Sequence, residues 1–271
     1  MPVAADVQDL VGVAPLTLVF LLISAGLAGW VDAVSGGGGL IQLPALLVGL
    51  PQAAPATVLG TNKCSSIIGT TAAANTYRRA AVNDLRTAVP MAVAAFFGSA
   101  LGAHLASRIP SSYFRPLALV LLIIVGAWTL LRPALGEDQE LRWHGTENHV
   151  RHGIAAVAMG GVIGTYDGVF GPGTGTFLVF GLVWLLGYSF LNASAIAKVV
   201  NVSTNLAAII VFGLGGHVLW ILGITMGMAN LTGAVLGART AVRKGSGFVR
   251  LVFLSVVGLL LLKIGYDIFI H

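Results

Sequence analysis

Apolar segments long enough to cross a lipid bilayer recur along the whole sequence. A membrane-spanning helix needs about 20 predominantly apolar residues, and segments 114–131 and 248–270 are of this kind. Only 9% of the 271 residues are charged. The short alternating segments typical of a transmembrane β-barrel are absent from the sequence. We therefore predict an all-α integral membrane protein surrounded by lipid.

The sequence contains an internal repeat. A shift of 135 residues aligns 32–105 with 167–240 without a gap. The shift places "DAVSGGG" (32–38) on "DGVFGPG" (167–173), Lys63 on Lys198, and "GSALGA" (98–103) on "GAVLGA" (233–238). We interpret this as a duplication. It predicts a first transmembrane repeat (1–132), a cytoplasmic linker (133–151) and a second transmembrane repeat (152–271), each repeat with about five apolar segments.

The distribution of basic residues predicts that the two repeats are inverted. Arg78, Arg79 and Arg86 follow the third segment of the first repeat, whereas the equivalent loop, 213–218, has no Lys or Arg. After the fourth segment the bias is reversed. Because basic loops stay on the cytoplasmic side, equivalent loops should face opposite sides, with both termini periplasmic or extracellular. The net charge of +5 reflects this bias, and we expect no nucleic-acid partner.

Glycine-rich stretches precede the short second segment of each repeat. Gly36, Gly37, Gly38 and Gly39 precede segment 40–50, and "GPGTGT" (171–176) precedes segment 174–187. Such short segments reach about half the bilayer, as re-entrant half-helices or tilted spans. The N-termini of broken helices bring free N–H groups to the membrane midplane, where they can bind an anion. Gly171, Gly173 and Thr174 become candidates by this argument, while simple packing kinks remain the alternative.

Four charged residues fall inside apolar segments: Asp32, Lys63, Asp167 and Lys198. Buried charges in a membrane are costly, so they are candidates for function. Two lysines beside two positive helix ends would suit a small anion. The alternative is a pair of structural ion pairs, with Lys63 and Lys198 bound to Asp167 and Asp32. The two aspartates are also candidates for carrying a coupling proton.

Polar residues near the lysines extend this candidate site. Asn62 directly precedes Lys63, and Asn201 lies three residues after Lys198, on the same side of a helix. Gln42 is a further candidate near the start of the first short helix. The "GSALG" and "GAVLG" stretches predict close helix packing. His149 and His152 belong to the linker, where we expect them in solvent.

These stretches resemble the TauE/SafE sulfite exporter family. The resemblance is carried by "GGGGLIQLPALLVGLPQAAPATVLGTNKCSSIIGT" (36–70), by "YRRAAVNDLR" after it, and by "GPGTGTF" in the second copy. It implies transport of sulfite or organosulfonates across the bacterial inner membrane. It also implies binding roles for Gly36 to Gly39, Thr61, Asn62, Lys63, Gly171, Pro172, Gly173 and Lys198. The second copy has "AIAK" where the first has "GTNK", so its amide has to come from elsewhere.

The function predicted from the sequence is secondary transport of a small sulfur-containing anion. Alternating access around a midplane site, driven by a coupling proton or cation, is the mechanism we expect. A passive anion channel is the alternative, and a membrane-embedded enzyme is a weaker one. We expect no enzymatic activity, cofactor or metal, because G-x-x-x-x-G-K-[ST], H-E-x-x-H and G-x-S-x-G motifs are absent from the sequence.

Overall fold

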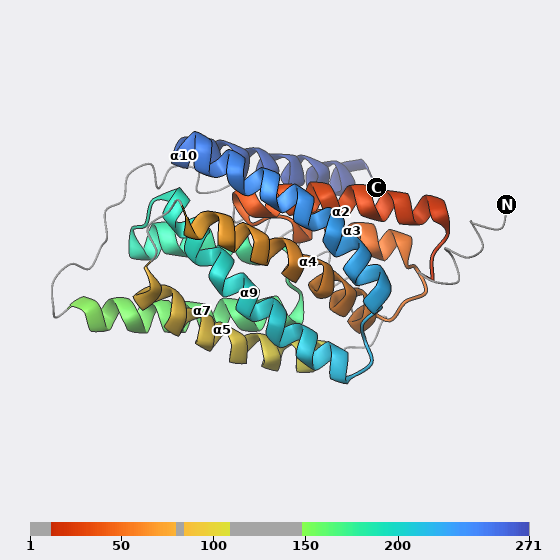
Figure 1. Ribbon diagram of the computed structural model, residues 1–271, viewed down its shortest axis with the longest axis horizontal. Coiled ribbons are helices and arrows are strands. Elements are labelled where there is room, and N and C mark those ends of the chain that lie inside the picture. Colours follow the sequence, from red (N-terminus) through yellow and green to blue (C-terminus); the bar gives the residue numbers. More distant parts are fainter. Residues whose placement is uncertain (1–11, 80–83, 109–147, 271) are drawn as a thin grey trace.

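The computed structural model describes residues 12–79, 84–108 and 148–270, and every regular element in these ranges is a helix (Figure 1). This confirms the all-α prediction. The helices of the first described part are α2 (Pro15–Ser35), α3 (Gly39–Gly49), α4 (Pro55–Arg78) and α5 (Leu85–Ala106). The second part contains α7 (Asn148–Val169), α8 (Thr174–Gly181), η1 (Leu182–Leu186), α9 (Phe190–Leu214) and α10 (Trp220–Ile270), which is kinked at Gly245.

Four of the described helices are long and apolar enough to cross a membrane. They are Pro15–Ser35, Leu85–Ala106, Phe190–Leu214 and Trp220–Gly245. The predicted segment 248–270 forms the C-terminal part of α10, whereas 114–131 lies outside the described residues. The chain is therefore a multi-pass membrane protein. The expected short segments appear as Gly39–Gly49 and Thr174–Leu186.

Helix starts in the two halves follow the 135-residue shift. Gly39 and Thr174 begin α3 and α8, Pro55 and Phe190 begin α4 and α9, and Leu85 and Trp220 begin α5 and α10, each pair 135 residues apart. The first helix of the second half starts earlier than expected, at Asn148 rather than at 152. Its first turn therefore uses residues that we expected in the linker.

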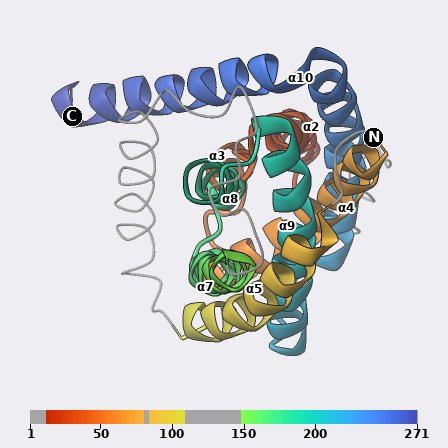
Figure 2. The same ribbon diagram turned by 90° about the vertical axis from the view of Figure 1, so that its left-hand side faces the viewer.

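The helices pack in three levels, seen most easily along the long axis (Figure 2). α2 and α10 lie on one side, α5 and α7 on the opposite side, and α4 and α9 between them. Glycines allow the close approach of the helices in both outer pairs, α5 with α7 and α2 with α10. A Cβ atom on Gly98 of α5 would lie 2.4 Å from the Gly161 carbonyl oxygen of α7, and one on Gly233 of α10 would lie 1.9 Å from that of Gly26 in α2. These are the small-residue faces predicted from the sequence, and they let the helix backbones touch.

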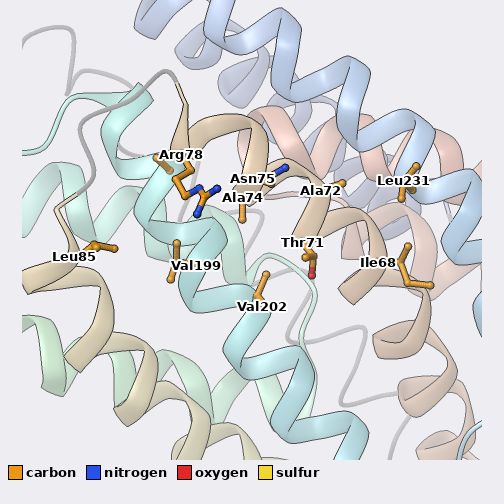
Figure 3. Close-up of a pocket in the computed structure, with 11 residues that line it drawn as sticks. Ile68, Thr71, Ala72, Ala74, Asn75, Arg78, Leu85, Val199, Val202 and Leu231 are labelled. Carbon is orange, nitrogen blue, oxygen red and sulfur yellow. The ribbon is translucent and has the colours of Figure 1, made fainter.

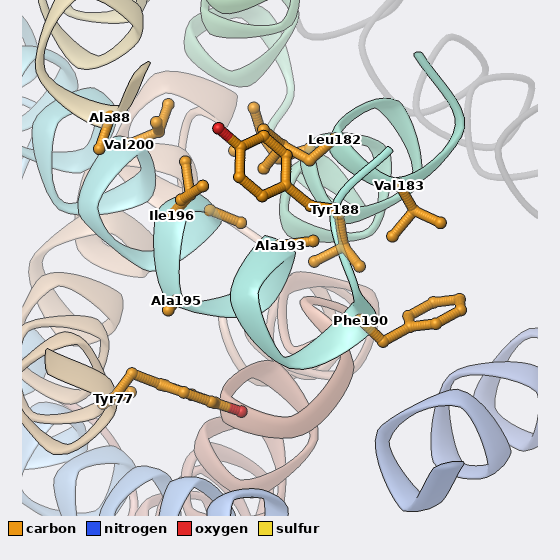
Figure 4. Packing of buried hydrophobic residues seen from close by; sticks show 14 of the residues in the cluster. Tyr77, Ala88, Leu182, Val183, Tyr188, Phe190, Ala193, Ala195, Ile196 and Val200 are labelled. Atoms are coloured by element: carbon orange, nitrogen blue, oxygen red, sulfur yellow. The ribbon is translucent and has the colours of Figure 1, made fainter. Parts of the chain in front are cut away.

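Apolar side chains fill the interior and also cover the outside. One buried cluster joins Leu182, Tyr188 and Ile196 to side chains of α4, α5 and α7 (Figure 4). On the outer faces, Leu27 and Phe97 are 58% and 68% exposed. Large exposed apolar side chains on the long helices suit contact with lipid tails, so core and surface are both apolar.

Candidate functional site

Two helix breaks meet at the centre of the molecule. Gly36 ends α2 in the left-handed conformation, with φ of 79°, and Gly171 follows α7 with φ of 91°. A Cβ atom on Gly36 would lie 2.2 Å from the Gly175 carbonyl carbon, and one on Gly39 would lie 3.0 Å from Pro172 Cα. The N-terminal ends of α3 and α8 therefore face each other, backbone against backbone, and only glycine allows this approach at Gly36.

A polar face on each of α4 and α9 lies beside these breaks. Lys63, Ser66 and Thr70 share one face of α4 by their helical spacing, and Lys198, Asn201 and Asn205 occupy the equivalent positions of α9. All of these side chains except Ser66 are at least nine-tenths buried. Two helices with polar stripes therefore enclose the central contact.

The four central charges form two crossed ion pairs. Lys63 Nζ lies 2.5 Å from Asp167 Oδ2, and Lys198 Nζ lies 2.8 Å from Asp32 Oδ2. Each lysine thus binds the aspartate of the other half, as the ion-pair alternative anticipated. The pairs differ in surroundings. The Asp167 side chain is 5% exposed and that of Asp32 20%, and Lys198 Nζ also donates to the Asp32 main-chain oxygen.

A small cavity lies against these pairs. Its volume of about 30 Å³ is room for about two water molecules. The cavity is lined by Asp32, Gly36, Gly39, Asn62, Lys63, Ser66, Thr70, Asp167, Gly171, Thr174, Gly175, Asn201 and Asn205. At this volume the cavity is too small for a four-atom oxyanion.

Two amide groups in this cavity have an unused acceptor. Asn62 and Asn201 are 4% and 6% exposed, yet the Oδ1 atom of each has no hydrogen-bond partner within the described part of the chain. A buried acceptor without a donor costs about 1–3 kcal/mol. The cavity is therefore built to receive a hydrogen-bond donor near these two amides.

Several predicted residues lie away from the cavity lining. Gln42 accepts from Asn230 Nδ2 at 2.8 Å, and Thr61 Oγ1 accepts from the Leu219 N–H at 3.1 Å, so both serve helix packing. Thr174 reaches the cavity but donates its hydroxyl proton to the Gly171 oxygen at 2.7 Å. Of the site residues predicted from the sequence, those that do not line the cavity are Gly37, Gly38, Gln42, Thr61, Pro172, Gly173 and Lys198.

The sequence reasoning missed four lining residues: Ser66, Thr70, Gly175 and Asn205. The repeat contained a signal for three of them. Ser66 and Thr70 align with Asn201 and Asn205 under the 135-residue shift, and all four continue the polar face that begins at each lysine. Gly175 gave no such signal because it aligns with Leu40.

A larger groove lies on the other side of α4 and α9, with a volume of about 600 Å³ (Figure 3). It shares no residue with the small cavity. The lining is Ile68, Thr71, Ala72, Ala74, Asn75, Arg78, Leu85, Ala195, Val199, Val202 and Leu231. Its largely apolar surface makes it a poor candidate for binding a small anion.

A polar cluster joins the two halves near the C-terminal end of α4. Thr87 donates to Asp84 Oδ2 at 2.9 Å, Tyr188 donates to the same carboxylate, and His152 Nε2 lies 3.0 Å from Thr87 Oγ1. Burial opposes the charged form of Asp84, but these hydrogen bonds outweigh it and hold its pKa below the usual 3.8. Burial lowers the pKa of His152 below 6.5, more than Asp84 raises it. The expectation that His152 lies in solvent is wrong, because α7 begins early.

The described residues contain no group of three His, Cys, Asp or Glu side chains that could hold a metal ion. What the central site offers instead is two ammonium groups, two carboxylates and several amides and hydroxyls at the meeting point of two helix N-termini. Such a set can bind a small anion once a lysine leaves its carboxylate.

The chain matches one family of known proteins. The sequence profile of the family "Sulfite exporter TauE/SafE" matches residues 21–264. "Probable membrane transporter protein ORF9" of Sinorhizobium sp is 37% identical over 243 residues, which cover 88% of this chain and 89% of that protein. "Probable membrane transporter protein YfcA" of Escherichia coli (strain K12) is 34% identical over 256 residues, covering 94% and 92%. A "Probable membrane transporter protein" of Haemophilus influenzae is 34% identical over 254 residues, covering 93% and 96%. No solved structure matches the chain.

Proposed function

The chain belongs to the TauE/SafE sulfite exporter family of membrane transporters, and on this basis we propose that it carries small sulfur-containing anions across the bacterial inner membrane. Sulfite and sulfonates are the proposed cargo. The name of the family supports this choice of chemistry, and the central site supports it with two buried ammonium groups.

One observation carries the proposal: a buried lysine, Lys63, lines a small cavity at the facing N-termini of α3 and α8. An oxyanion there would receive hydrogen bonds from the ammonium group and favourable interaction with both helix dipoles. Asn62 and Asn201 could turn their amide N–H groups toward it, because rotation of an amide exchanges donor and acceptor.

Alternating access is the proposed mechanism. Both halves of the chain contribute residues to the cavity lining, among them glycines of the two helix breaks. Rocking of one set of helices against the other would open it to one side at a time. We propose the Arg78 end of α4 as the cytoplasmic side, in line with the positive-inside bias, with both termini on the opposite side.

Uptake into liposomes tests the function. Purified full-length chain is reconstituted and screened with sulfite, sulfate, thiosulfate, sulfoacetate and taurine. We expect saturable uptake of at least one sulfur oxyanion and its acceleration by the same anion inside the vesicle. Flux that rises linearly with concentration and shows no counterflow would identify a channel. No flux or binding of any of these anions would refute the proposed cargo.

A further inference from the structure

We propose that Asp167 accepts a proton each time Lys63 accepts an anion, so that transport is coupled to protons. This inference rests on the proposed function and names the group that couples it. The argument begins with charge balance in the cavity. Lys63 is matched by Asp167 at 2.5 Å and Lys198 by Asp32 at 2.8 Å, so the four side chains sum to zero.

An anion entering this neutral, buried site adds an uncompensated charge. Burial of an unpaired charge is strongly unfavourable, and carboxylates already face the cavity from two directions. If one carboxylate takes up a proton as a monoanion enters, the net charge stays at zero. Lys63 then exchanges one anionic partner for another.

The structure favours Asp167 over Asp32 as the proton acceptor. Lys63 and Asp167 both line the cavity, and Asp167 is the only hydrogen-bond acceptor of Lys63 within the described ranges. Lys198 does not line the cavity and holds both the carboxylate and the main-chain oxygen of Asp32. Protonation of Asp167 therefore releases the ammonium group of Lys63, which lines the cavity. Protonation of Asp32 releases no ammonium group into the cavity, because Lys198 does not line it and still binds the Asp32 main-chain oxygen.

The unused amide acceptors point the same way. Asn62 and Asn201 line the same small cavity as the carboxylates, and their buried Oδ1 atoms lack a donor among the described residues. An ionised carboxylate only accepts hydrogen bonds, while a protonated one donates. Protonated Asp167 therefore supplies a hydrogen-bond donor at a site where the two amide oxygens lack one.

Few other titratable groups surround Asp167. Lys63 of α4, Lys198 of α9 and Asp32 of α2 face the same centre, and Tyr166 is its neighbour on α7. α8 contributes threonines and no titratable side chain. α5 meets this part of α7 through Gly102, whose Cβ atom would lie 2.2 Å from the Thr165 oxygen. The histidine of α5, His104, is an exposed side chain, and α8 has no histidine, so neither helix offers a buried histidine as an alternative acceptor.

The exchange balances in atoms and charge. A proton from water bonds to a carboxylate oxygen of Asp167, and the Lys63–Asp167 ion pair breaks. The Lys63 ammonium keeps its three protons and donates to an oxygen of the incoming anion. Release of the anion on the other side returns the proton and restores the ion pair, so one monoanion moves with one proton and no net charge.

Infrared difference spectroscopy on the purified full-length chain tests this directly, with sulfite as the probe. We expect sulfite to produce the C=O stretching band of a protonated carboxyl group. The band should vanish in Asp167→Asn and persist in the matched variant Asp32→Asn. In the wild-type chain the dissociation constant of sulfite should rise up to about tenfold per pH unit, and in Asp167→Asn the protein should add no such slope.

The wild-type spectrum decides the matter even if Asp167→Asn cannot be purified. Sulfite binding without a new carboxyl band would overturn the coupling while leaving anion transport in place, and so would binding that requires Na⁺ instead of a proton. Loss of the band in Asp32→Asn alone would move the proton to the other pair and overturn the assignment. Absence of sulfite binding would remove the proposed cargo and this inference together.

Discussion

Lys63–Asp167 and Lys198–Asp32 occupy equivalent positions in the two halves, yet their surroundings differ. The first pair lines the cavity through both members, and its lysine has one acceptor among the described residues. In the second pair the lysine is buried behind Asp32 and holds two of its oxygens. The same pair of residue types can thus serve exchange in one crossed pair and anchorage in the other, because the number of partners decides how easily a lysine leaves.

The ends of the two halves also differ. Asp84 and Thr87 form a polar cluster with Tyr188 and His152, whereas the residues 135 positions along the chain from Asp84 and Thr87 are Leu219 and Leu222. The two halves therefore carry the same residue types at the central ion pairs but different residue types at positions 84 and 87 and their counterparts 219 and 222. An effect of pH that acts through this cluster therefore has no counterpart at residues 219 and 222.

Removal of the exchange pair should have the largest effect on transport. Lys63→Met combined with Asp167→Asn removes both charges at once, so no unpaired ion remains. We expect uptake of the anion to fall about a hundredfold, since a charged hydrogen bond contributes about 1.5–3 kcal/mol. The matched double variant Lys198→Met with Asp32→Asn should lose less than about tenfold, because Lys198 does not line the cavity. Equal losses in the two double variants, measured by uptake into liposomes, would erase the distinction between the pairs.

The anchoring lysine should matter most for stability. Lys198→Met alone leaves Asp32 without its cation, and because the Asp32 side chain is 20% exposed we expect a loss below the roughly 3–5 kcal/mol of a fully buried pair. Adding Asp32→Asn should recover much of this loss, because the unpaired charge is gone. Unfolding in detergent measures both variants. A Lys198→Met chain as stable as the wild type would show that the pair does not anchor α2.

The two left-handed glycines should respond unequally to alanine. At Gly36 the new methyl group meets the backbone of Gly175, which cannot move aside, whereas at Gly171 it meets the flexible end of Lys63 at 3.0 Å. The backbone conformation alone costs about 1–2 kcal/mol at either position. We expect Gly171→Ala to lose about that amount and Gly36→Ala considerably more, by the same unfolding measurement. A smaller loss at Gly36 would contradict the close contact of the loops.

Acidification should have the smallest effect, confined to the polar cluster. Because the pKa of His152 is lowered on folding, its contribution to stability is present above pH 6.5 and is lost as the pH falls through 6.5 toward the folded value. The lowered pKa of Asp84 acts only below about pH 3.8. The melting temperature should therefore fall as the medium is acidified from slightly alkaline to below the ordinary pKa of histidine, and His152→Gln should reduce that fall. An identical fall in the variant would exclude His152 as its source.

The helices, the breaks and the charged centre could be predicted because each has a local signature in the sequence. The glycine-rich stretches at 36–39 and 171–173 interrupt helices, and charges within apolar segments must find partners, so an ion pair of Lys63 with Asp167 was one of the two interpretations that the sequence allowed. The small-residue faces at 98–103 and 233–238 could be predicted from the sequence in the same way. Inversion of the two repeats, the orientation in the membrane and the substrate-binding roles remain predictions.

Other features depended on the rotation of helices, which no local pattern records. Gln42 and Thr61 are polar and close to the site in sequence, but packing turns them toward Asn230 and Leu219. Ser66 and Thr70 were legible only in the alignment of the two halves. The difference between the two lysines was not predictable, because it arises from which oxygens of the partner half reach each ammonium group.

The crossed pairs also bear on how the protein is made. Lys63 leaves the ribosome 104 residues before Asp167, and Asp32 precedes Lys198 by 166 residues. Neither charge can be neutralised by its eventual partner until synthesis has reached the second half of the chain. The first half therefore enters the bilayer before its central ion pairs can form. The central ion pairs form only when the second half follows.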